Sequence, residues 1–514
     1  MIKLNYNYGF KWHNQDDIFV KGYIYDEHNN FYKDEKLVEY FSCVQNKDQF
    51  KEKLCNANGV FSVIIKLESM YLVAVDKLRT FPLFYYQTND EYILSDDTYF
   101  FQKTFNLLFN EISKDELLSA GYTTDKYTML NNVYQVQPGE YIILEQGNLN
   151  LFREFYTSYA TNELTSSTEQ QLKKEFSDIL DNITLRLIQS LAGKMALIPL
   201  SGGYDSRLVA TLLKKHNYTN VVCFTYGNTN SFEVEISKEV ALKLGFKWYF
   251  IEYTENLIGD YVQTEDFQKY YKFAYNNNAC FLLQDYFAIQ YLHNNNLVAK
   301  NAVVLTGHSG DLLAGSQLPL DIKYKCNDKK IVNKILSQTY ALNTPKNVNV
   351  LRKRIQENLT NDYAYSIVEN FFINRKISRF IINSHRIYEF FGYEHRLPLW
   401  DDELTKFFKI IPYEYKCEPY FYEEYLLKTL FEEYDIAIVP PDKIGRNTLI
   451  SKLKRNIKKL IPQSIVDFRE KIIFDNINNV DYMSKPLIES SEPIIQDSSN
   501  IDKVIVAWLS NKSC

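Results

Sequence analysis

The chain has 514 residues, 46% of them hydrophobic and 24% charged, which is the composition of a globular protein with more than one domain. Its net charge of −6 gives no electrostatic reason to expect a nucleic-acid partner. The chain has seven cysteines and no CxxC motif, which predicts a reduced cytoplasmic protein. No apolar run approaches the roughly 18 residues of a membrane span, so we expect no membrane insertion.

The first part of the chain is predicted to consist mainly of strands and turns. Short β-rich runs, separated by polar turns, lie at residues 61–66, 71–75, 91–95 and 141–144. The stretch 160–168 is polar and unpatterned, so we interpret it as a linker. We therefore expect a first domain at residues 1–158 and a second at 169–514.

The second domain is predicted to be an α/β unit. Helical apolar spacing at 170–190 is followed by alternating elements, with strands at 195–200, 221–225 and 248–252 and helices at 208–215 and 234–244. This alternation predicts a doubly wound parallel sheet with helices on both faces. Residues from about 345 to 435 have mostly helical patterns, which predicts a helical lobe beside the sheet.

The most informative segment is Ser-Gly-Gly-Tyr-Asp-Ser-Arg at 201–207, between a strand ending at Leu200 and a helix beginning near Leu208. Gly202 and Gly203 lack Cβ atoms, so the backbone can fold closely around an anion. The loop amides and the helix N-terminus then point at that anion. The segment lacks the Gly-Lys-Ser/Thr of a Walker loop.

Other polar groups could complete a site for ATP and Mg²⁺. Ser201 and Ser206 add hydroxyl donors, and Asp205 is a carboxylate that can hold Mg²⁺ against phosphate oxygens. A second apolar strand runs into a glycine-containing loop at 303–311. Its carboxylate, Asp311, is a candidate second Mg²⁺ ligand facing Asp205.

These two segments resemble the nucleotide motifs of the asparagine synthetase family. The first is similar to the pyrophosphate loop of ATP pyrophosphatases. The second motif of the family reads Ser-Gly-Glu-Gly-x-Asp; Thr306, Gly307 and Asp311 fit it, whereas His308 stands where the family has Glu. The resemblance implies that a substrate is adenylated with release of pyrophosphate, and that ATP and Mg²⁺ are required.

Three further segments, at 232–241, 393–401 and 442–445, resemble the same family. The last one implies that Lys443 is catalytic. The resemblance assigns Leu200, Tyr226, Thr306 and Gly307 to ATP binding, and the chemistry of the first loop adds Ser201, Gly202, Gly203, Asp205 and Ser206.

The first domain resembles the glutaminase domain of that family, which implies an Ntn-type αββα fold. Residues 75–85 are similar to the family's Arg-Asp-x-x-Gly-x-x-Pro-Leu-Tyr segment. The glutaminase needs an N-terminal cysteine, but here Ile2 follows Met1. The family's Asn-Gly-Glu is best matched by Lys21-Gly22-Tyr23. We therefore expect a degenerate domain that does not hydrolyse glutamine.

This loss is also found in relatives that join a carboxylate to an amine, namely β-lactam synthetases and lasso-peptide cyclases. In them Tyr or His replaces the Glu of the second motif, as His308 does here. A histidine of near-neutral pKa can take the proton that an attacking ammonium must lose. Two interpretations stay open: His308 is the base, or it only fills the site.

The sequence thus predicts an ATP-dependent amide-forming ligase that acts on a small-molecule or sugar carboxylate and on ammonia or an amine. Relatives with this loop variant are found in polysaccharide and secondary-metabolite assembly. Asparagine synthesis from free ammonia and a non-catalytic nucleotide-binding scaffold are the alternatives. The oligomeric state is open. Apolar residues between 449 and 461 form one helical face with lysines and an arginine beside it, which fits a packed basic helix better than a membrane-surface helix.

Overall fold

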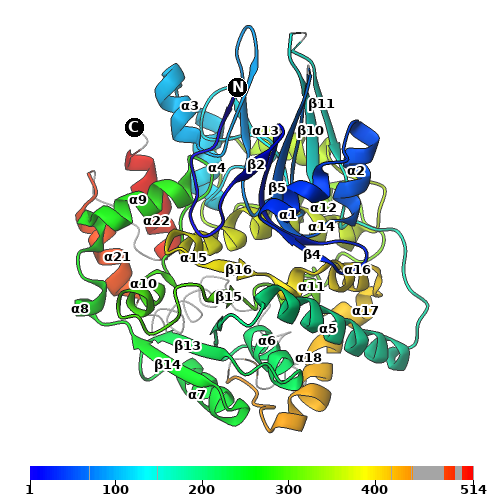
Figure 1. Ribbon diagram of the computed structural model, residues 1–514, viewed down its shortest axis with the longest axis vertical. Helices are drawn as coiled ribbons and strands as arrows, with labels where there is room; N and C mark the ends of the chain where they lie inside the picture. Colours follow the sequence, from blue (N-terminus) through cyan, green and yellow to red (C-terminus); the bar gives the residue numbers. More distant parts are fainter. Residues whose placement is uncertain are drawn as a thin grey trace.

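The computed structural model describes residues 1–68, 70–147, 149–417, 420–441, 443, 480–492 and 500–512. The basic helix expected at 449–461 lies outside these residues, as do the neighbours of Lys443 at 442, 444 and 445. Figure 1 shows the N-terminal strands above and the later α/β part below. Within the described residues, no helix is both long and apolar enough for a transmembrane span.

The N-terminal part contains two sheets that are antiparallel except for the β1–β8 pair. The smaller sheet has the order β1-β8-β7-β9, and the larger has β11-β10-β6-β5-β3-β2, with β4 beside β3. The runs expected as strands form parts of β5, β6, β8 and β10. The bounds are β1 Ile2–Lys3, β2 His13–Gln15, β3 Ile18–Tyr25, β4 Phe31–Lys33, β5 Asn58–Leu67, β6 Met70–Val75, β7 Phe84–Gln87, β8 Tyr92–Ser95, β9 Val133–Gln135, β10 Glu140–Glu145 and β11 Leu151–Phe155.

Four layers follow from the alternation of side chains along these strands. Val73 and Ile142 of the larger sheet share a core with Tyr85 of the smaller sheet, so the two sheets pack face to face. The other face of the larger sheet packs on α1 (Glu35–Phe41) and α2 (Lys47–Asn56). The smaller sheet packs on α3 (Thr98–Phe105), and α4 (Glu111–Ala120) follows it. The αββα layering is as predicted. The positions of the helices α1 to α4 were not predicted from the sequence.

The later part is built on a five-stranded sheet of order β14-β13-β12-β15-β16, in which every pair is parallel. Its strands are β12 Ala196–Pro199, β13 Val221–Gly227, β14 Lys247–Glu252, β15 Val303–Leu305 and β16 Glu394–Arg396. One face packs on α5 (Glu169–Leu191), α6 (Tyr204–Lys215) and α7 (Phe232–Leu244). The other packs on α9 (Glu265–Tyr275) and α10 (Tyr286–Asn294). The predicted doubly wound parallel sheet is confirmed.

Most of the remaining helices form the expected helical lobe, but β16 interrupts it. This strand is only three residues long, too short for a periodicity to show. The other helices are α8 Glu255–Ile258, η1 Tyr261–Gln263, α11 Gly310–Leu313, α12 Asp328–Thr339, α13 Val348–Gln356, α14 Ala364–Phe372, the π-helix η2 Ile373–Ile381, η3 Ile382–His385, α15 Arg386–Phe390, η4 Pro398–Trp400, α16 Asp402–Ile410, α17 Tyr413–Lys416, α18 Tyr420–Tyr425, η5 Leu426–Leu430, η6 Glu432–Tyr434, α21 Val480–Glu489 and α22 Ile501–Lys512.

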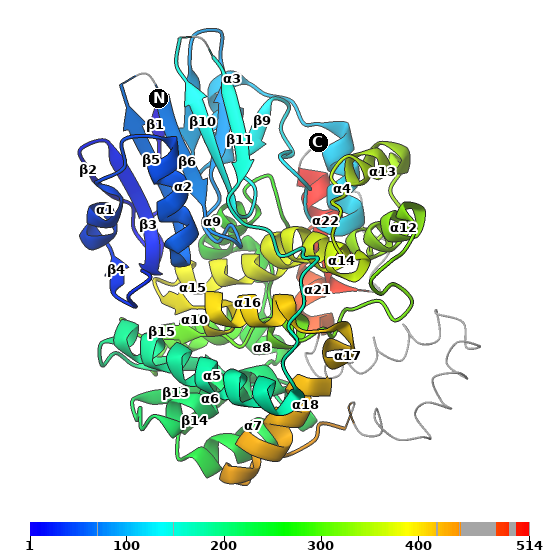
Figure 2. The ribbon, with the colours of Figure 1, turned by 90° about the vertical axis from the view of Figure 1, so that its right-hand side faces the viewer.

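The chain between β11 and α5 contains no regular element, in line with a linker at 160–168. The two parts nevertheless share packed surfaces. Leu117 of α4 and Trp508 of α22 belong to one hydrophobic cluster, and Figure 2 shows α22 beside α4. The division at 158 and 169 therefore stays a prediction.

Candidate nucleotide site

A cavity of about 400 Å³ lies at the carboxyl ends of β12, β13 and β15. Ligands of open α/β sheets bind at this edge, where the strand order reverses. Every residue predicted for the site lines the cavity except Gly202, namely Leu200, Ser201, Gly203, Asp205, Ser206, Tyr226, Thr306, Gly307, His308, Asp311 and Lys443.

The loop after β12 is shorter than expected, because α6 begins at Tyr204 rather than near Leu208. Asp205 and Ser206 therefore lie in the first turn of the helix, where a carboxylate complements the helix dipole. The polar residues at 204–206 predict a loop, but a helix N-terminus favours the same residue types.

Hydrogen bonds hold this loop in shape. The backbone N–H of Ser201 donates to the Ser206 hydroxyl at 3.1 Å, and that of Gly203 donates to the Ser201 hydroxyl at 3.2 Å. Gly202 lies behind the loop surface, where its carbonyl accepts a hydrogen bond from Arg207 at 2.9 Å.

Gly307 brings the second loop directly against α6. A Cβ atom at this position would lie 2.7 Å from the Cα of Ser206, closer than real contacts allow. A glycine is therefore required where the two loops meet, and the contact places Asp311 beside Asp205.

Asp205 and Asp311 form the acidic end of the cavity. The Asp311 N–H donates to one carboxylate oxygen of Asp205 at 3.0 Å, and the Tyr422 hydroxyl donates to the other at 2.8 Å. Burial, followed by the charge of Asp311, raises the pKa of Asp205 to about 8. The charge of Asp311 repels a charged Asp205. A bound cation would offset this repulsion, so the pair fits a Mg²⁺ site. In the described chain no cluster of three or more His, Cys, Asp or Glu could hold a metal alone, so phosphate oxygens would have to complete the coordination.

Lys443 supplies a positive charge at the same cavity. Its Nζ pairs with Glu423 at 2.8 Å and lies 4.0 Å from the centre of the Tyr204 ring. These contacts fix the side chain beside the first turn of α6, and its charge lowers the pKa of Asp205.

His308 contacts a second histidine, His385, behind the cavity wall. His385 Nδ1 lies 2.9 Å from the Ile382 carbonyl, which can only accept, so Nδ1 carries the proton. The other nitrogen of a neutral His385, Nε2, is then an acceptor for His308 Nδ1 at 3.3 Å and for the Thr306 hydroxyl at 2.9 Å. This arrangement leaves Nε2 of His308 with a free lone pair. Burial lowers the pKa of both histidines, which favours their neutral forms.

An aromatic wall closes another side of the cavity. The Tyr226 ring stacks on Tyr253 at 4.9 Å. Asp285 lines the cavity here and accepts a hydrogen bond from the Tyr388 hydroxyl.

Sequence reasoning missed Tyr422, Glu423, Asp285 and His385. Tyr422, Asp285 and His385 belong to segments far along the chain from the residues that they contact, and Glu423 lies 20 residues before Lys443. No local pattern marks such a residue, so only the packing of α18, α10 and η3 against the sheet identifies them.

Glycine-containing loops on a doubly wound parallel sheet, with paired carboxylates and a lysine at one cavity, fit the class of ATP-dependent amide ligases. The family described as asparagine synthase matches residues 192–504. The chain therefore belongs to the asparagine synthase family, and it is an ATP-using enzyme that acts on small-molecule substrates.

No curated protein sequence matches the chain. Among solved structures it is similar to an NH3-dependent NAD synthetase from Campylobacter jejuni, with 16% identity over 43% of this chain and 96% of that one and a TM-score of 0.22. The glutamine phosphoribosylpyrophosphate amidotransferase from B. subtilis, complexed with ADP and GMP, shows 11% identity over 57% and 63% of the chains and a TM-score of 0.19. TM-scores this low support no argument about this chain.

Proposed function

We propose that the protein adenylates a carboxylate with ATP and transfers the acyl group to an amine or ammonia, releasing AMP and pyrophosphate. One observation carries the proposal: a single cavity holds the Asp205–Asp311 pair, the Lys443 charge and the neutral imidazole of His308. The first three groups suit phosphate chemistry, and the last suits removal of a proton from an amine.

In the first half-reaction, the N-terminus of α6 and the Ser201 and Ser206 hydroxyls bind the phosphates. Asp205 and Asp311 would hold Mg²⁺, which when bound neutralises charge on the phosphate oxygens. The carboxylate oxygen attacks the α-phosphorus, and pyrophosphate leaves. Lys443 stabilises the negative charge that develops toward pyrophosphate.

In the second half-reaction, the amine nitrogen attacks the acyl carbon and AMP leaves. The attacking nitrogen loses a proton, and Nε2 of His308 is the available acceptor at the cavity. If His308 only fills the site, its replacement should not slow the second half-reaction selectively.

We propose that the division at 158 and 169 separates this ligase unit from a domain without glutaminase activity. Lys21, which matches part of the family's glutamine-binding motif, is buried and donates to the Tyr6 carbonyl at 3.0 Å. The nitrogen would then come from free ammonia or an amine substrate.

The scaffold alternative does not account for a half-buried acidic pair, because repulsion between carboxylates costs stability without a cation to bind. Asparagine formation from ammonia uses the same two half-reactions and differs only in the carboxylate. A small-molecule carboxylate, including an acidic sugar as in polysaccharide assembly, is the substrate class we propose. The six described cysteines are free, as is usual in the cytoplasm, which is the compartment we propose.

The test is a screen that traps the acyl group. Purified protein, Mg²⁺ and ATP are incubated with fractionated metabolites and hydroxylamine, which converts an acyl adenylate into a hydroxamate. We expect pyrophosphate and one hydroxamate to appear together, and neither with the Asp205→Asn variant. Active protein that forms ADP and phosphate instead would contradict the proposal.

A further inference from the structure

Arg79 lies in the turn between β6 and β7 in an unfavourable backbone conformation. In the family segment that residues 75–85 resemble, glycine occupies this position. Arg79 has φ of +54°, in the left-handed region that favours glycine, and the residue is only 4% exposed. A strained, buried arginine where a glycine would fit without strain indicates a specific role for its guanidinium.

The guanidinium of Arg79 has two free donors side by side. Its Nε and Nη2 atoms are buried and have no hydrogen-bond partner among the described residues. In Arg186 the same two nitrogens bind both oxygens of Asp401, at 3.0 and 2.9 Å. In Arg153 they bind both oxygens of Glu140, at 2.8 and 2.7 Å. The free edge of Arg79 therefore has the geometry for a group with two oxygens.

Two further arginines lie near Arg79. Arg379 of η2 and Arg386 of α15 lie close enough to Arg79 to lower its pKa, although burial is the larger cause. Nη1 of Arg379 is also buried without a partner in the described chain. The Phe84 ring, 5.8 Å from the Arg79 guanidinium, stabilises the cation only weakly.

The nearby carboxylates make hydrogen bonds or ion pairs with other groups, although the charge of Asp76 also acts on Arg79 and raises its pKa. Asp76 accepts from the Leu78 and Thr80 amides of its own turn, at 2.7 and 2.9 Å. Glu389 pairs with Arg386 at 3.3 Å.

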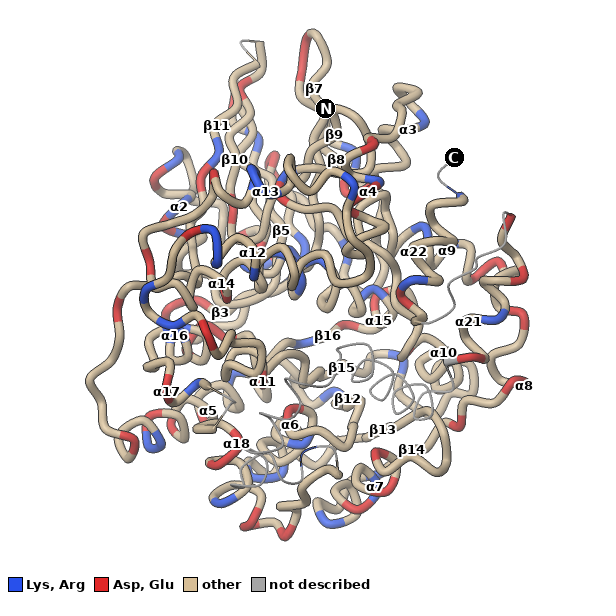
Figure 3. Tube along the Cα trace, turned by 180° about the vertical axis from the view of Figure 1, so that it is seen from behind, with Lys and Arg blue, Asp and Glu red and all other residues tan. Residues whose placement is uncertain are grey.

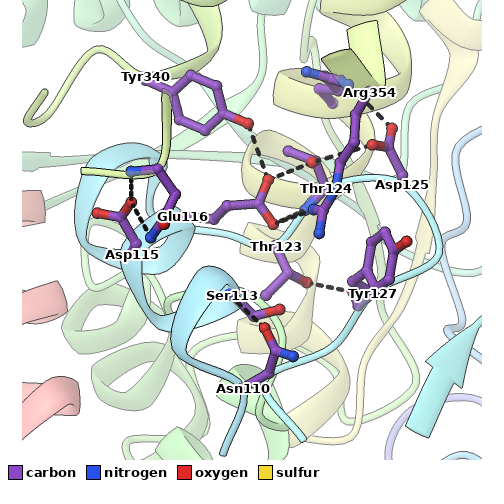
Figure 4. A network of polar contacts seen from close by, with 12 residues as sticks. Asn110, Ser113, Asp115, Glu116, Thr123, Thr124, Asp125, Tyr127, Tyr340 and Arg354 are labelled. Carbon is purple, nitrogen blue, oxygen red and sulfur yellow. Dashed lines mark hydrogen bonds and ion pairs between the residues drawn. The ribbon is translucent and has the colours of Figure 1, made fainter. Parts of the chain in front are cut away.

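Asp125 pairs with Arg375 at 3.1 Å. Figure 4 shows Asp125 beside the network in which Thr124, Tyr340 and Arg354 bind Glu116. The Asp125 carbonyl accepts a hydrogen bond from Nη2 of Arg379 at 2.7 Å, which leaves Nη1 of Arg379 without a partner among the described residues. Burying more cations than anions costs folding free energy. A further anion beside Arg79 and Arg379 would therefore stabilise the contact between the N-terminal sheets and η2.

We propose that Arg79 and Arg379 bind a small oxyanion between the N-terminal sheets and η2. The ligand presents two oxygens to Arg79, as a carboxylate or an inorganic oxyanion does. It must be small because the surroundings are buried. This site is separate from the nucleotide cavity, and the proposal does not depend on the ligase reaction.

The experiment compares thermal unfolding in sodium formate, sodium phosphate and sodium gluconate at equal ionic strength. Gluconate is too bulky for a buried position and serves as the reference. We expect formate or phosphate to raise the midpoint of the wild type by about 2–4 °C. A response to formate alone assigns a carboxylate, and one to phosphate assigns an inorganic oxyanion.

The Arg79→Gly variant removes both the guanidinium and the strain, and we expect it to show no anion response. Arg352→Gln is the matched control, because Arg352 makes a surface hydrogen bond to Asn333 at 2.6 Å, and it should respond like the wild type. If Arg79→Gly fails to fold, Arg379→Gln should need a roughly tenfold higher anion concentration for the same rise in the unfolding midpoint. This factor corresponds to the loss of about one charge-assisted hydrogen bond. Equal responses from the wild type and the variant, or no response to either anion, would overturn the proposal.

Discussion

Asp205 is the residue whose chemistry depends most on its surroundings. Its pKa of about 8 in the folded protein exceeds the value of 3.8 that applies to an unperturbed Asp. The folded state therefore binds this proton more tightly than the unfolded state does. The stability from the protonated form is fully present below about pH 4 and is lost as the pH rises through 8.

The Asp205→Asn variant cannot lose this stability, because asparagine does not titrate. In EDTA we expect its melting temperature to exceed that of the wild type by more at pH 8 than at pH 5. Adding Mg²⁺ should raise the midpoint of the wild type and not that of the variant. Asp90→Asn, at an exposed position, is the control. Melting curves of wild type and Asp205→Asn that shift in parallel with pH would remove Asp205 from the acidic pair.

Lys443 and His308 are expected to serve different half-reactions. Lys443→Ala should lower both pyrophosphate–ATP exchange and amide formation by roughly a hundredfold, because the charge acts on the phosphates. His308→Ala should keep the exchange and slow amide formation by roughly a hundredfold. Lys428→Ala, which removes an exposed partner of Glu424, is the control. Loss of exchange in His308→Ala together with its retention in Lys443→Ala would reverse the assignment.

Among the elements, the meeting of the two loops depends on Gly307. In Gly307→Ala the added Cβ would press on Ser206, so the loops must separate and the phosphate site widen. We expect nucleotide affinity to fall on the order of tenfold or more, which corresponds to about 1.4 kcal/mol. Equilibrium binding of a fluorescent ATP analogue measures it. The control is Gly193→Ala, which has a strained φ of +79° but lies in open space, and it should bind the analogue normally. Normal binding of the analogue by Gly307→Ala would show that the loops adapt.

The sequence predicted the elements whose patterns are strong and local. Strands β5, β6, β10 and β13 combine β-branched or aromatic residues with clear bounds, and the glycines at 202, 203 and 307 mark the two loops. The start of α6 was wrong by four residues because Tyr204, Asp205 and Ser206 suit a helix N-terminus as well as a loop.

The missed features depend on contacts between distant segments. The short strand β16 is defined by its pairing with β15, and His385 matters only because the packing of η3 brings it to His308. The secondary-structure propensities of residues along the chain do not reveal contacts between distant segments.

In the whole molecule, a buried network joins α4 to the helical lobe. Glu116 is 0% exposed and pairs with Arg354 at 3.3 Å. Arg354→Met would leave the carboxylate buried without its cation, so we expect a loss of about 3–5 kcal/mol in the free energy of unfolding, measured with denaturant. Lys353→Met, at an exposed pair with Glu357, should change it little. A loss under about 1 kcal/mol in Arg354→Met would show that the ion pair is dispensable.

Glutamine is not expected to supply nitrogen. The buried Lys21 occupies part of the segment that matches the family's glutamine-binding motif. Purified protein should release no glutamate from glutamine above the background of the buffer, measured by mass spectrometry during turnover. Glutamate formation at a rate comparable with ligation would show a glutaminase of another design.

The fate of the carboxylate oxygens tests the central claim most directly. The carboxylate found by the hydroxamate screen is labelled with ¹⁸O and incubated with ATP, Mg²⁺ and the amine. Adenylation transfers one carboxylate oxygen to the α-phosphorus, so we predict AMP with one ¹⁸O atom and unlabelled pyrophosphate, each equimolar with the amide. Label in inorganic phosphate together with ADP would contradict the account.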